Sequence, residues 1–231
     1  MIEHLTIFAQ ETLAPKRVLT LPDQRERLTQ IITKCHRIEN NPIFHLTDSN
    51  TELEKRDIDR LPIAEIHNPE EVDVNILEFD SFIKEVAVRK NDLPSCCDQL
   101  LWTDNEVLCV ELSSSQAKYV SKAGIDYAVI QATGQLAKED KQIKRAKALL
   151  QLRNSVKQLS KSKFGVSLMS KEKKSAGFFF RLTDPQGPAG IMARAFSRAP
   201  IFQTRTSYPP SPDFPDWEFF SQPHHQPYQI Q

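Results

Sequence analysis

The sequence predicts an α/β protein, with a mixed central sheet, a β-hairpin and flanking helices, followed by a Pro-rich C-terminal tail. Two short apolar runs joined by a turn lie within residues 98–113, a long stretch with helical spacing follows, and nine of the fifteen prolines lie between Pro185 and Pro227. The chain of 231 residues is long enough for one core plus extensions. We expect an N-terminal arm and helix (residues 1–45), an α/β core (46–184) and an extended tail (185–231).

The N-terminal part is predicted to contribute one helix. The short apolar patches Leu5–Phe8 and Val18–Leu19 indicate an edge strand or an arm. The pair Pro22-Asp23 then suits a first helical turn, because proline lacks only an N–H that is unpaired there and aspartate favours the positive helix end. Apolar residues continue at helical spacing, and Asn40-Asn41-Pro42 predicts that the helix ends near Ile38.

Strand signals begin after an acidic loop. Residues 46–70 are acidic and are interrupted by Pro62 and Pro69, which predicts a loop with at most a short helix. Residues that fit a pleated sheet are then frequent, and Asn91–Pro94 predicts the next reversal. The residues expected in strands are Val72, Val74, Ile76, Phe79, Phe82, Ile83, Val86 and Val88.

Residues 98–113 are predicted to form the hairpin. Asp104-Asn105 favours a reversal, because the side chains of both residues bond nearby backbone groups. If this pair forms the turn, the antiparallel register places Asp98 opposite Glu111. Directly opposed residues have Cβ atoms about 4.5 to 5.5 Å apart, and like charges held there are destabilising unless something compensates, usually a divalent cation. The register therefore predicts a candidate metal site at these two acids.

The chain beyond the hairpin is predicted to cross over to a parallel strand. Ser113–Ser115 can cap a long helical stretch, and a break near Gly134–Asp140 divides that stretch into two packed helices. Phe164–Met169 and Gly177–Leu182 have the composition of strands, and the basic segment Ser170–Lys174 is the expected loop between them. Such a crossover is long enough to return a strand parallel to the second hairpin strand.

The C-terminal segment is predicted to be an extended or disordered tail, because its prolines disfavour regular core elements. It contains an acidic and aromatic cluster, Pro212–Phe220. The cluster either docks into a groove of a partner protein or packs across its own domain. The residues assigned to docking are Phe214, Trp217, Phe219 and Phe220.

The charges are unevenly distributed although the net charge is zero. Between Asp48 and Glu85, twelve acids stand against four bases, a net charge of −8. Between Lys138 and Lys174, twelve bases stand against three acids, a net charge of +9. Two interpretations of the second region remain open. It is either a solvated lysine-rich helix face or a surface that faces a polyanion. The residues assigned to nucleic-acid phosphates are Lys141, Lys144, Arg145, Lys171, Lys173 and Lys174.

Cysteine usage and the first residues indicate a cytoplasmic protein. The four cysteines form no C-x-x-C pair, and three lie in or beside apolar runs, which favours buried, reduced thiols. The N-terminal stretch lacks the basic and apolar regions of a signal peptide, and no apolar run approaches the roughly 18 residues of a membrane helix. The sequence also lacks the glycine motifs that bind nucleotides, so neither a membrane partner nor a nucleotide cofactor is expected.

The order of strands, acid-bearing hairpin, helical crossover and further strand resembles the PD-(D/E)xK superfamily, the restriction-endonuclease-like nucleases. The matching stretch is Cys97-Asp98-Gln99-Leu100-Leu101 followed by Val110-Glu111-Leu112-Ser113, within a resemblance over about residues 71–182. In that family an Asp at the start of one strand and a (D/E)-x-Lys at the end of its hairpin partner hold catalytic magnesium. The resemblance implies a restriction-endonuclease-like fold, with Asp98 and Glu111 as Mg²⁺ ligands.

The sequence departs from the family pattern at the lysine, where Ser113 stands. Serine brings neither positive charge nor a group matched to proton transfer near neutral pH. Three alternatives remain open. Lys118 or Lys122 reaches back from the following helix, an upstream acid such as Glu78 or Asp80 completes a carboxylate-only metal site, or the site is inactive and the fold serves binding or assembly.

Two functions are therefore expected. The first is a metal-dependent nuclease-like protein that acts on nucleic acid phosphodiesters, by resemblance part of a prokaryotic antiviral defence or mobile-element system. The second is a catalytically inactive nuclease-fold subunit that binds nucleic acid or acts as a scaffold in a multi-protein complex. Nucleic acid and other protein subunits are the expected partners. The opposed acids and the basic region favour the first function, and Ser113 favours the second.

Overall fold

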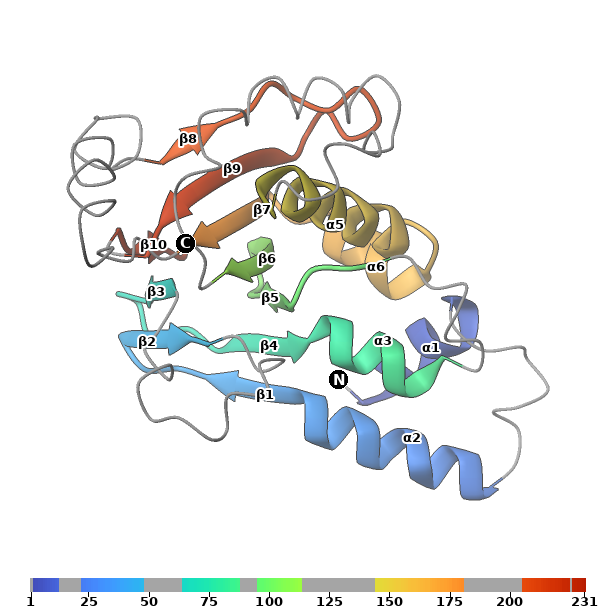
Figure 1. The fold of residues 1–231 in the computed structure, drawn as a ribbon. Coiled ribbons are helices and arrows are strands. Elements are labelled where there is room, and N and C mark those ends of the chain that lie inside the picture. Colours follow the sequence, from blue (N-terminus) through green and yellow to red (C-terminus); the bar gives the residue numbers. More distant parts are fainter. Residues whose placement is uncertain are drawn as a thin grey trace, which may run out of the picture.

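A mixed seven-stranded sheet forms the centre of the computed structural model, and a three-stranded sheet and five helices pack around it in the described residues (Figure 1). The described residues are 2–12, 22–47, 64–87, 95–113, 144–180, 205–224 and 226–231. The central sheet, in spatial order, contains β1 (His36–Glu39), β4 (Val74–Glu78), β5 (Gln99–Trp102), β6 (Glu106–Ser113), β7 (Lys173–Phe180), β9 (Glu218–Pro223) and β8 (Thr206–Ser207). The smaller sheet contains β10 (Tyr228–Gln229), β3 (Ala64–His67) and β2 (Ile43–Leu46). The helices are α1 (Ile2–Thr12), α2 (Pro22–Cys35), α3 (Phe79–Val86), α5 (Lys144–Leu159) and α6 (Lys163–Met169).

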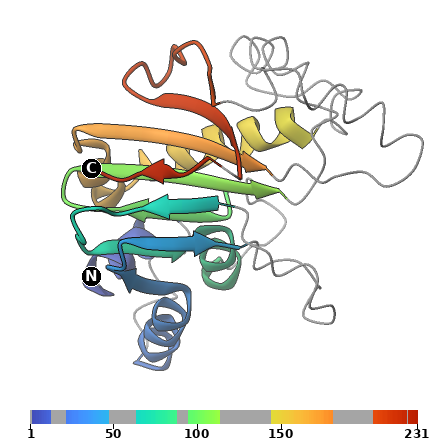
Figure 2. The same ribbon diagram turned by 90° about the vertical axis from the view of Figure 1, so that its left-hand side faces the viewer.

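The centre of the sheet has the predicted hairpin and crossover. Strands β4, β5 and β6 form an antiparallel meander, and β7 pairs with β6 in parallel. Between β6 and β7 the chain passes through α5 and α6, so the described part of the crossover to a parallel strand is helical, as predicted, while residues 114–143 lie outside the described part. Figure 2 shows the strands stacked one above another, from the blue N-terminal strands to the red C-terminal strand.

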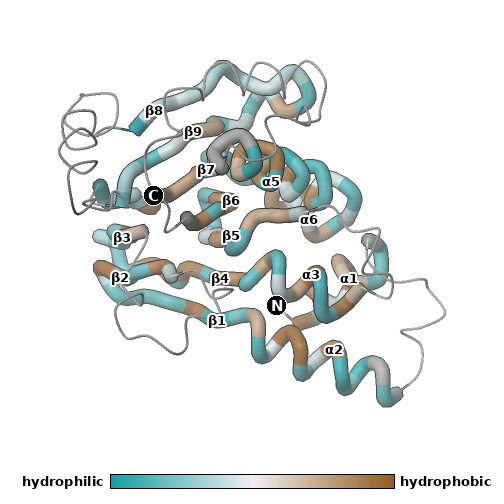
Figure 3. Tube along the Cα trace, viewed as in Figure 1, coloured by the Kyte–Doolittle hydropathy of each residue, from teal (hydrophilic) through white to brown (hydrophobic). Residues whose placement is uncertain are grey.

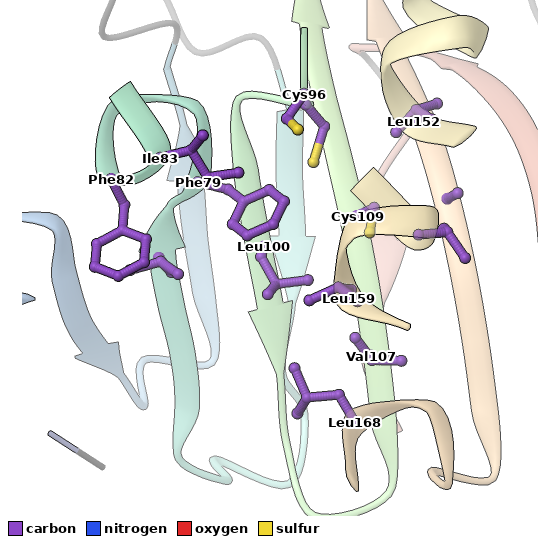
Figure 4. Packing of buried hydrophobic residues seen from close by; sticks show 14 of the residues in the cluster. Phe79, Phe82, Ile83, Cys96, Leu100, Val107, Cys109, Leu152, Leu159 and Leu168 are labelled. Atoms are coloured by element: carbon purple, nitrogen blue, oxygen red, sulfur yellow. The ribbon is translucent and has the colours of Figure 1, made fainter. Parts of the chain in front are cut away.

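Alternate side chains of the central strands enter two different cores. The first core lies between the sheet and the helices, and it includes Leu100, Val107 and Cys109 from the hairpin together with Leu152 and Leu159 of α5 (Figure 4). The second core lies between the sheet and the three-stranded sheet, and Leu101, Leu108, Val110, Ile66 and Tyr228 belong to it. Figure 3 shows the corresponding concentration of hydrophobic residues along the central strands. Residues buried on both sheet faces explain why these strands are nearly continuous apolar runs.

Helix α2 confirms the helix predicted from Pro22, although it ends at Cys35 rather than near Ile38. His36 to Glu39 instead form β1, which pairs with β4. The acidic region predicted as a loop contributes β3 and the end of β2 to the smaller sheet, while residues 48–63 lie outside the described part. Within the described segments, no helix is both long and apolar enough to cross a bilayer.

Three apolar segments predicted as strands, one of them alternatively as an arm, are helices. Leu5, Phe8 and Ala9 are buried on one side of α1, in the segment predicted as an edge strand or an arm. The segment from Phe79 to Val86 forms α3, and Phe164–Met169 lies in α6 rather than in a strand. In each case the buried residues recur every three or four positions, the helical period. Because these runs are short, the helical period is not evident in their sequence. Their β-branched and aromatic residues favour a strand instead.

The C-terminal segment is not an extended tail where it is described. Strand β9 joins the central sheet parallel to β7, and β10 joins the smaller sheet beside β3. Strand β7 also begins at Lys173, so the predicted basic loop Ser170–Lys174 is shorter than expected. The predicted helical break at Gly134–Asp140 lies outside the described residues.

Candidate acidic site at the open end of the hairpin

The observed register of the hairpin is the predicted one. Gln99 pairs with Val110 and Trp102 with Val107, and the Thr103 N–H donates to the Glu106 carbonyl at 3.0 Å to close the turn. The pairing ends at Gln99 and Val110, and Asp98 is the residue that precedes β5. Extended by one position, the register puts Asp98 opposite Glu111, so both acids lie at the open end of the hairpin, away from the turn.

Asp98 is held from three directions. Its carboxylate oxygen Oδ2 accepts a hydrogen bond from the Leu112 N–H at 2.7 Å. Its backbone carbonyl accepts from the Phe79 N–H at 2.8 Å, at the start of α3. The preceding residue, Cys97, donates its N–H to the Ser155 hydroxyl of α5 at 2.7 Å. Strand β6 and two helices thus fix the position of this half-buried carboxylate.

Glu111 lies on the helix-covered side of the sheet. It is opposite Phe178 in the parallel pairing with β7, and Phe178 belongs to the first core. Its exposed fraction is only 8%, so its carboxylate lies at the border of the core rather than in bulk solvent. Ser113 is the last residue of β6, and its side chain lies outside the described part of the structure.

Glu78 does not share a site with Glu111, contrary to the prediction that it completes the metal site. It is opposite Gln99, and Gln99 is opposite Val110 of the second core. Its side chain therefore lies on the other face of the sheet from Glu111, because successive residues of a strand point to opposite faces. There, Glu78 Oε1 accepts from Arg37 Nη1 at 2.8 Å and from Gln99 Nε2 at 3.0 Å.

Asp80, the other upstream acid, lies in the first turn of α3. It is 7% exposed and forms an ion pair with Lys84 at 2.5 Å. Within the described segments, no three His, Cys, Asp or Glu side chains gather in a group that could hold a metal ion. Asp98 and Glu111 nevertheless fit Mg²⁺ by donor chemistry, because this ion usually takes one or two carboxylates and keeps several waters.

Three of the lysines assigned to phosphate contacts lie near the turn of the hairpin, not at its acidic end. Lys171 Nζ donates to the Asp104 carbonyl at 2.7 Å, and Lys174 Nζ donates to the Lys171 carbonyl at 3.1 Å. Lys173 forms an ion pair with the buried Glu106 at 3.1 Å. These three lysines, which the sequence assigns to phosphate contacts, are therefore engaged in contacts within the chain, at the other end of the hairpin from Asp98.

The remaining predicted site residues are only partly placed. Lys144 and Arg145 begin α5, but their side chains lie outside the described part. Lys118, Lys122 and Lys141 also lie outside the described residues. Gln151 of α5 donates to the Cys96 carbonyl at 3.1 Å, so the middle of this helix passes close to the segment that carries Asp98, just before β5.

The aromatic cluster assigned to docking packs across its own domain, the second of the two expected arrangements. Trp217, Phe219 and Phe220 are 3%, 1% and 0% exposed, and Phe214 packs partly buried against the first core. The Arg205 guanidinium covers the Phe220 ring at 3.8 Å. Trp217, Phe219 and Phe220 are therefore core residues in the described structure, and Phe214 lies at the edge of the core.

A buried carboxylate at the turn was not predicted. Glu106 is 2% exposed and accepts hydrogen bonds from the Tyr228 hydroxyl, from Lys173 and, at 3.1 Å, from the Gln231 N–H. Burial raises the pKa of Tyr228, and the neighbouring Glu106 charge raises it further, so Tyr228 remains a donor. A single Glu beside a turn carries no sequence signal for this contact, because its partners follow more than 60 residues later.

A row of polar side chains on the smaller sheet was also missed. Glu65 accepts from His67 Nε2 at 2.7 Å, and His45 Nε2 lies 3.5 Å from its other oxygen. The hydrogen bond from His67 lowers the pKa of Glu65. Polar and apolar residues alternate in Glu65-Ile66-His67, which is the period of a strand. This alternation is the sequence signal that could have identified the row.

No protein-family model matches the chain, and neither a curated protein nor a solved structure is significantly similar to it.

Proposed function

We propose that this protein is a magnesium-dependent nuclease-like protein that acts on nucleic acid phosphodiesters, with Asp98 and Glu111 as the metal ligands. The observation that supports the proposal is the hairpin register, which brings two carboxylates from adjacent strands to its open end. The proposal is also supported by the crossover from β6 to the parallel strand β7, because the PD-(D/E)xK resemblance implies a crossover of this kind. By the same resemblance, we place the protein in a prokaryotic defence or mobile-element system.

Each acid has a separate task in this proposal. The Leu112 N–H occupies Oδ2 of Asp98 and thereby orients the carboxylate, while Glu111 contributes a second ligand from the neighbouring strand. When bound, Mg²⁺ would supply an activated water and would stabilise the charge that develops on the phosphate. Because Ser113 replaces the lysine, Lys118 or Lys122 is proposed to supply the positive charge beside the water.

Cleavage of plasmid and of single-stranded DNA and RNA tests this proposal. The wild type is expected to cleave at least one substrate with Mg²⁺ and to stop when the metal is chelated. Glu111→Gln keeps the size of the side chain but removes its charge, so activity should fall to background. Glu65→Gln, on the smaller sheet, is the matched control and should cleave like the wild type. Equal cleavage by wild type and Glu111→Gln would refute the assignment.

A second candidate is a catalytically inactive nuclease-fold subunit that binds nucleic acid or acts as a scaffold. The specific observation that favours it is that the Asp98 carboxylate closes the hairpin by accepting the Leu112 N–H, a structural role that needs no metal. Ser113 in place of the lysine points the same way. In this case, exposed lysines of α5 and of the turn that follows it, such as Lys147, Lys157 and Lys161, carry the phosphate contacts.

Salt-dependent binding distinguishes the second candidate from the first. Labelled single- and double-stranded nucleic acid should bind without being cleaved, and the affinity should fall steeply as salt rises. Replacing Lys147, Lys157 and Lys161 together with glutamine should reduce the salt dependence by about three counterions. If the affinity and the salt dependence are unchanged, these three lysines do not belong to the binding surface.

A further inference from the structure

Strand β1 forms one border of the central sheet. In the described part of the chain its hydrogen-bonded neighbour is β4, on one side only. Figure 1 shows β1 at the lower border of the sheet, with α2 leading directly into it. The outer side of a border strand presents backbone N–H and C=O groups that can pair with another strand.

The sequence of β1 is unusual for a protected border strand. Ile38 at its centre is 55% exposed, which makes it one of the most exposed large apolar residues of the described structure. It is flanked by Arg37 and Glu39, whose side chains are 40% and 29% exposed to solvent. Border strands are usually protected by charges that repel a second strand. Here the two charges have opposite signs and stand symmetrically about an exposed isoleucine.

This pattern is complementary to itself. When two copies of Arg37-Ile38-Glu39 run antiparallel with Ile38 opposite Ile38, each Arg37 faces the Glu39 of the second copy. Opposed residues on adjacent strands interact directly, and opposite charges stabilise the pairing. Arg37 and Glu39 lie on the sheet face of the second core, because they are opposite Ile76 and Val74. Ile38 is opposite Asn75 and lies on the other face.

We propose that two copies of this chain associate through β1, antiparallel and about a two-fold axis through Ile38, so that their central sheets join into one. A two-fold interface is built from one surface patch that must match itself, and the Arg37-Ile38-Glu39 pattern meets this requirement. The antiparallel arrangement sends the two α2 helices to opposite ends of the shared strand pair, because α2 precedes β1 directly. The second copy thereby covers the exposed Ile38 and adds a cross-strand partner to Arg37 and Glu39, which within one chain already lie 3.8 Å apart as an ion pair.

Disulfide cross-linking of Ile38→Cys tests the pairing. All four native cysteines are buried, so the introduced thiol is the exposed one and lies directly opposite its symmetry mate. Under copper-phenanthroline and air, Ile38→Cys should form a covalent dimer within minutes. Ile43→Cys is the matched control, since Ile43 is 52% exposed but lies on β2 of the smaller sheet. Cross-linking of Ile38→Cys no faster than that of Ile43→Cys would overturn the proposal.

Sedimentation equilibrium measures the same association without a covalent bond. The wild type should show a species of twice 26.5 kDa. Glu39→Lys places a lysine opposite Arg37 at both symmetric positions, so the dimer dissociation constant should rise roughly tenfold. Glu26→Lys, at an exposed position of α2, makes the same charge change and should leave the constant unchanged. A wild type that sediments only as a monomer, or an equal effect of both variants, would refute pairing through β1.

Discussion

The Asp98 carboxylate accepts a hydrogen bond from the Leu112 N–H at 2.7 Å, which joins the start of β5 to the end of β6 beyond their last paired residues. Leu112 is 4% exposed, so this N–H has little access to water. A carboxylate proposed as a metal ligand thus also has a structural task. The two roles make different demands on the side chain, because the hydrogen bond needs an acceptor and the metal needs a negative charge.

Asp98→Asn and Asp98→Ala separate these roles. Asparagine keeps an acceptor for the Leu112 N–H, so stability without metal should remain close to that of the wild type. Alanine leaves the buried N–H without its acceptor, which should cost about 1–3 kcal/mol. Metal-dependent cleavage should be lost in both variants. Urea denaturation in the absence of Mg²⁺ measures the first effect, and equal destabilisation by the two substitutions would contradict the structural role of the hydrogen bond.

The hairpin and the opposed acids could be predicted from sequence because their determinants are local. The turn residues and both strands lie within sixteen positions, and the register follows from the turn alone. For Phe79–Val86 the sequence predicts a strand where the structure has α3, because apolar runs of this length are compatible with both periods. Packing of α3 against other elements, α2 among them, decides between the two periods, and no residue within the segment indicates this packing.

The C-terminal segment could not be predicted because its partners are distant. Strand β9 pairs with β7 about forty residues earlier, across Pro-rich sequence that by composition indicates disorder. Tyr228 stacks on Phe220 with ring centroids 5.6 Å apart and also bonds Glu106, 122 residues before it. Composition indicates whether a segment would fold in isolation. The C-terminal residues are ordered instead by contacts with strands and side chains that lie far away in the sequence.

Removal of the Glu106 carboxylate should release the C-terminal strand. Glu106→Ala removes the buried partner of the Tyr228 hydroxyl and of Lys173, but Lys173 is partly exposed and keeps its bond to the Gln229 carbonyl, so the cost should stay below the roughly 3–5 kcal/mol of a fully buried pair. Tyr228→Phe removes one hydrogen bond to a charged group and should cost about 1.5–3 kcal/mol. Hydrogen exchange should show faster exchange in β10 for both variants. Unchanged exchange there would mean that β10 is held by its apolar contacts alone.

Alkaline pH should destabilise the protein through its buried thiols. Burial raises the pKa of Cys35 to about 11, and burial also raises the pKa values of Cys96 and Cys97. Between pH 9.0 and about 11, Cys35 of the unfolded chain loses its proton while Cys35 of the folded chain keeps it. Folding then takes up a proton, so the stability present below this window falls as pH rises through it.

Cys35→Ser tests this origin of the alkaline instability. The substitution lowers stability at every pH because it buries a hydroxyl, but it removes the contribution of Cys35 to the slope. The unfolding free energy should therefore decrease less steeply above pH 9, by up to about 1.4 kcal/mol per pH unit. Urea denaturation at a series of pH values measures the slope. A parallel downward shift with an unchanged slope would show that Cys35 is not the titrating group.

The close approach of α5 and α6 predicts a large effect of one methyl group. A Cβ added to Gly165 would lie 1.9 Å from the Leu159 carbonyl oxygen at the end of α5. In an unhindered helix Gly→Ala is stabilising by about 1 kcal/mol, so the intrinsic preference and the packing have opposite signs here. Packing should dominate, because the nearest atoms belong to backbone that cannot move without separating two buried helices.

We therefore expect Gly165→Ala to lower the free energy of unfolding by about 3 kcal/mol or more. Val166→Ala on the same helix is the control, since Val166 is 55% exposed and its truncation should change stability by about 0.5 kcal/mol or less. Chemical denaturation of both variants gives the comparison. If Gly165→Ala is as stable as the wild type, α5 and α6 do not meet as closely as the structure places them, and the end of the crossover that leads into β7 must be arranged differently.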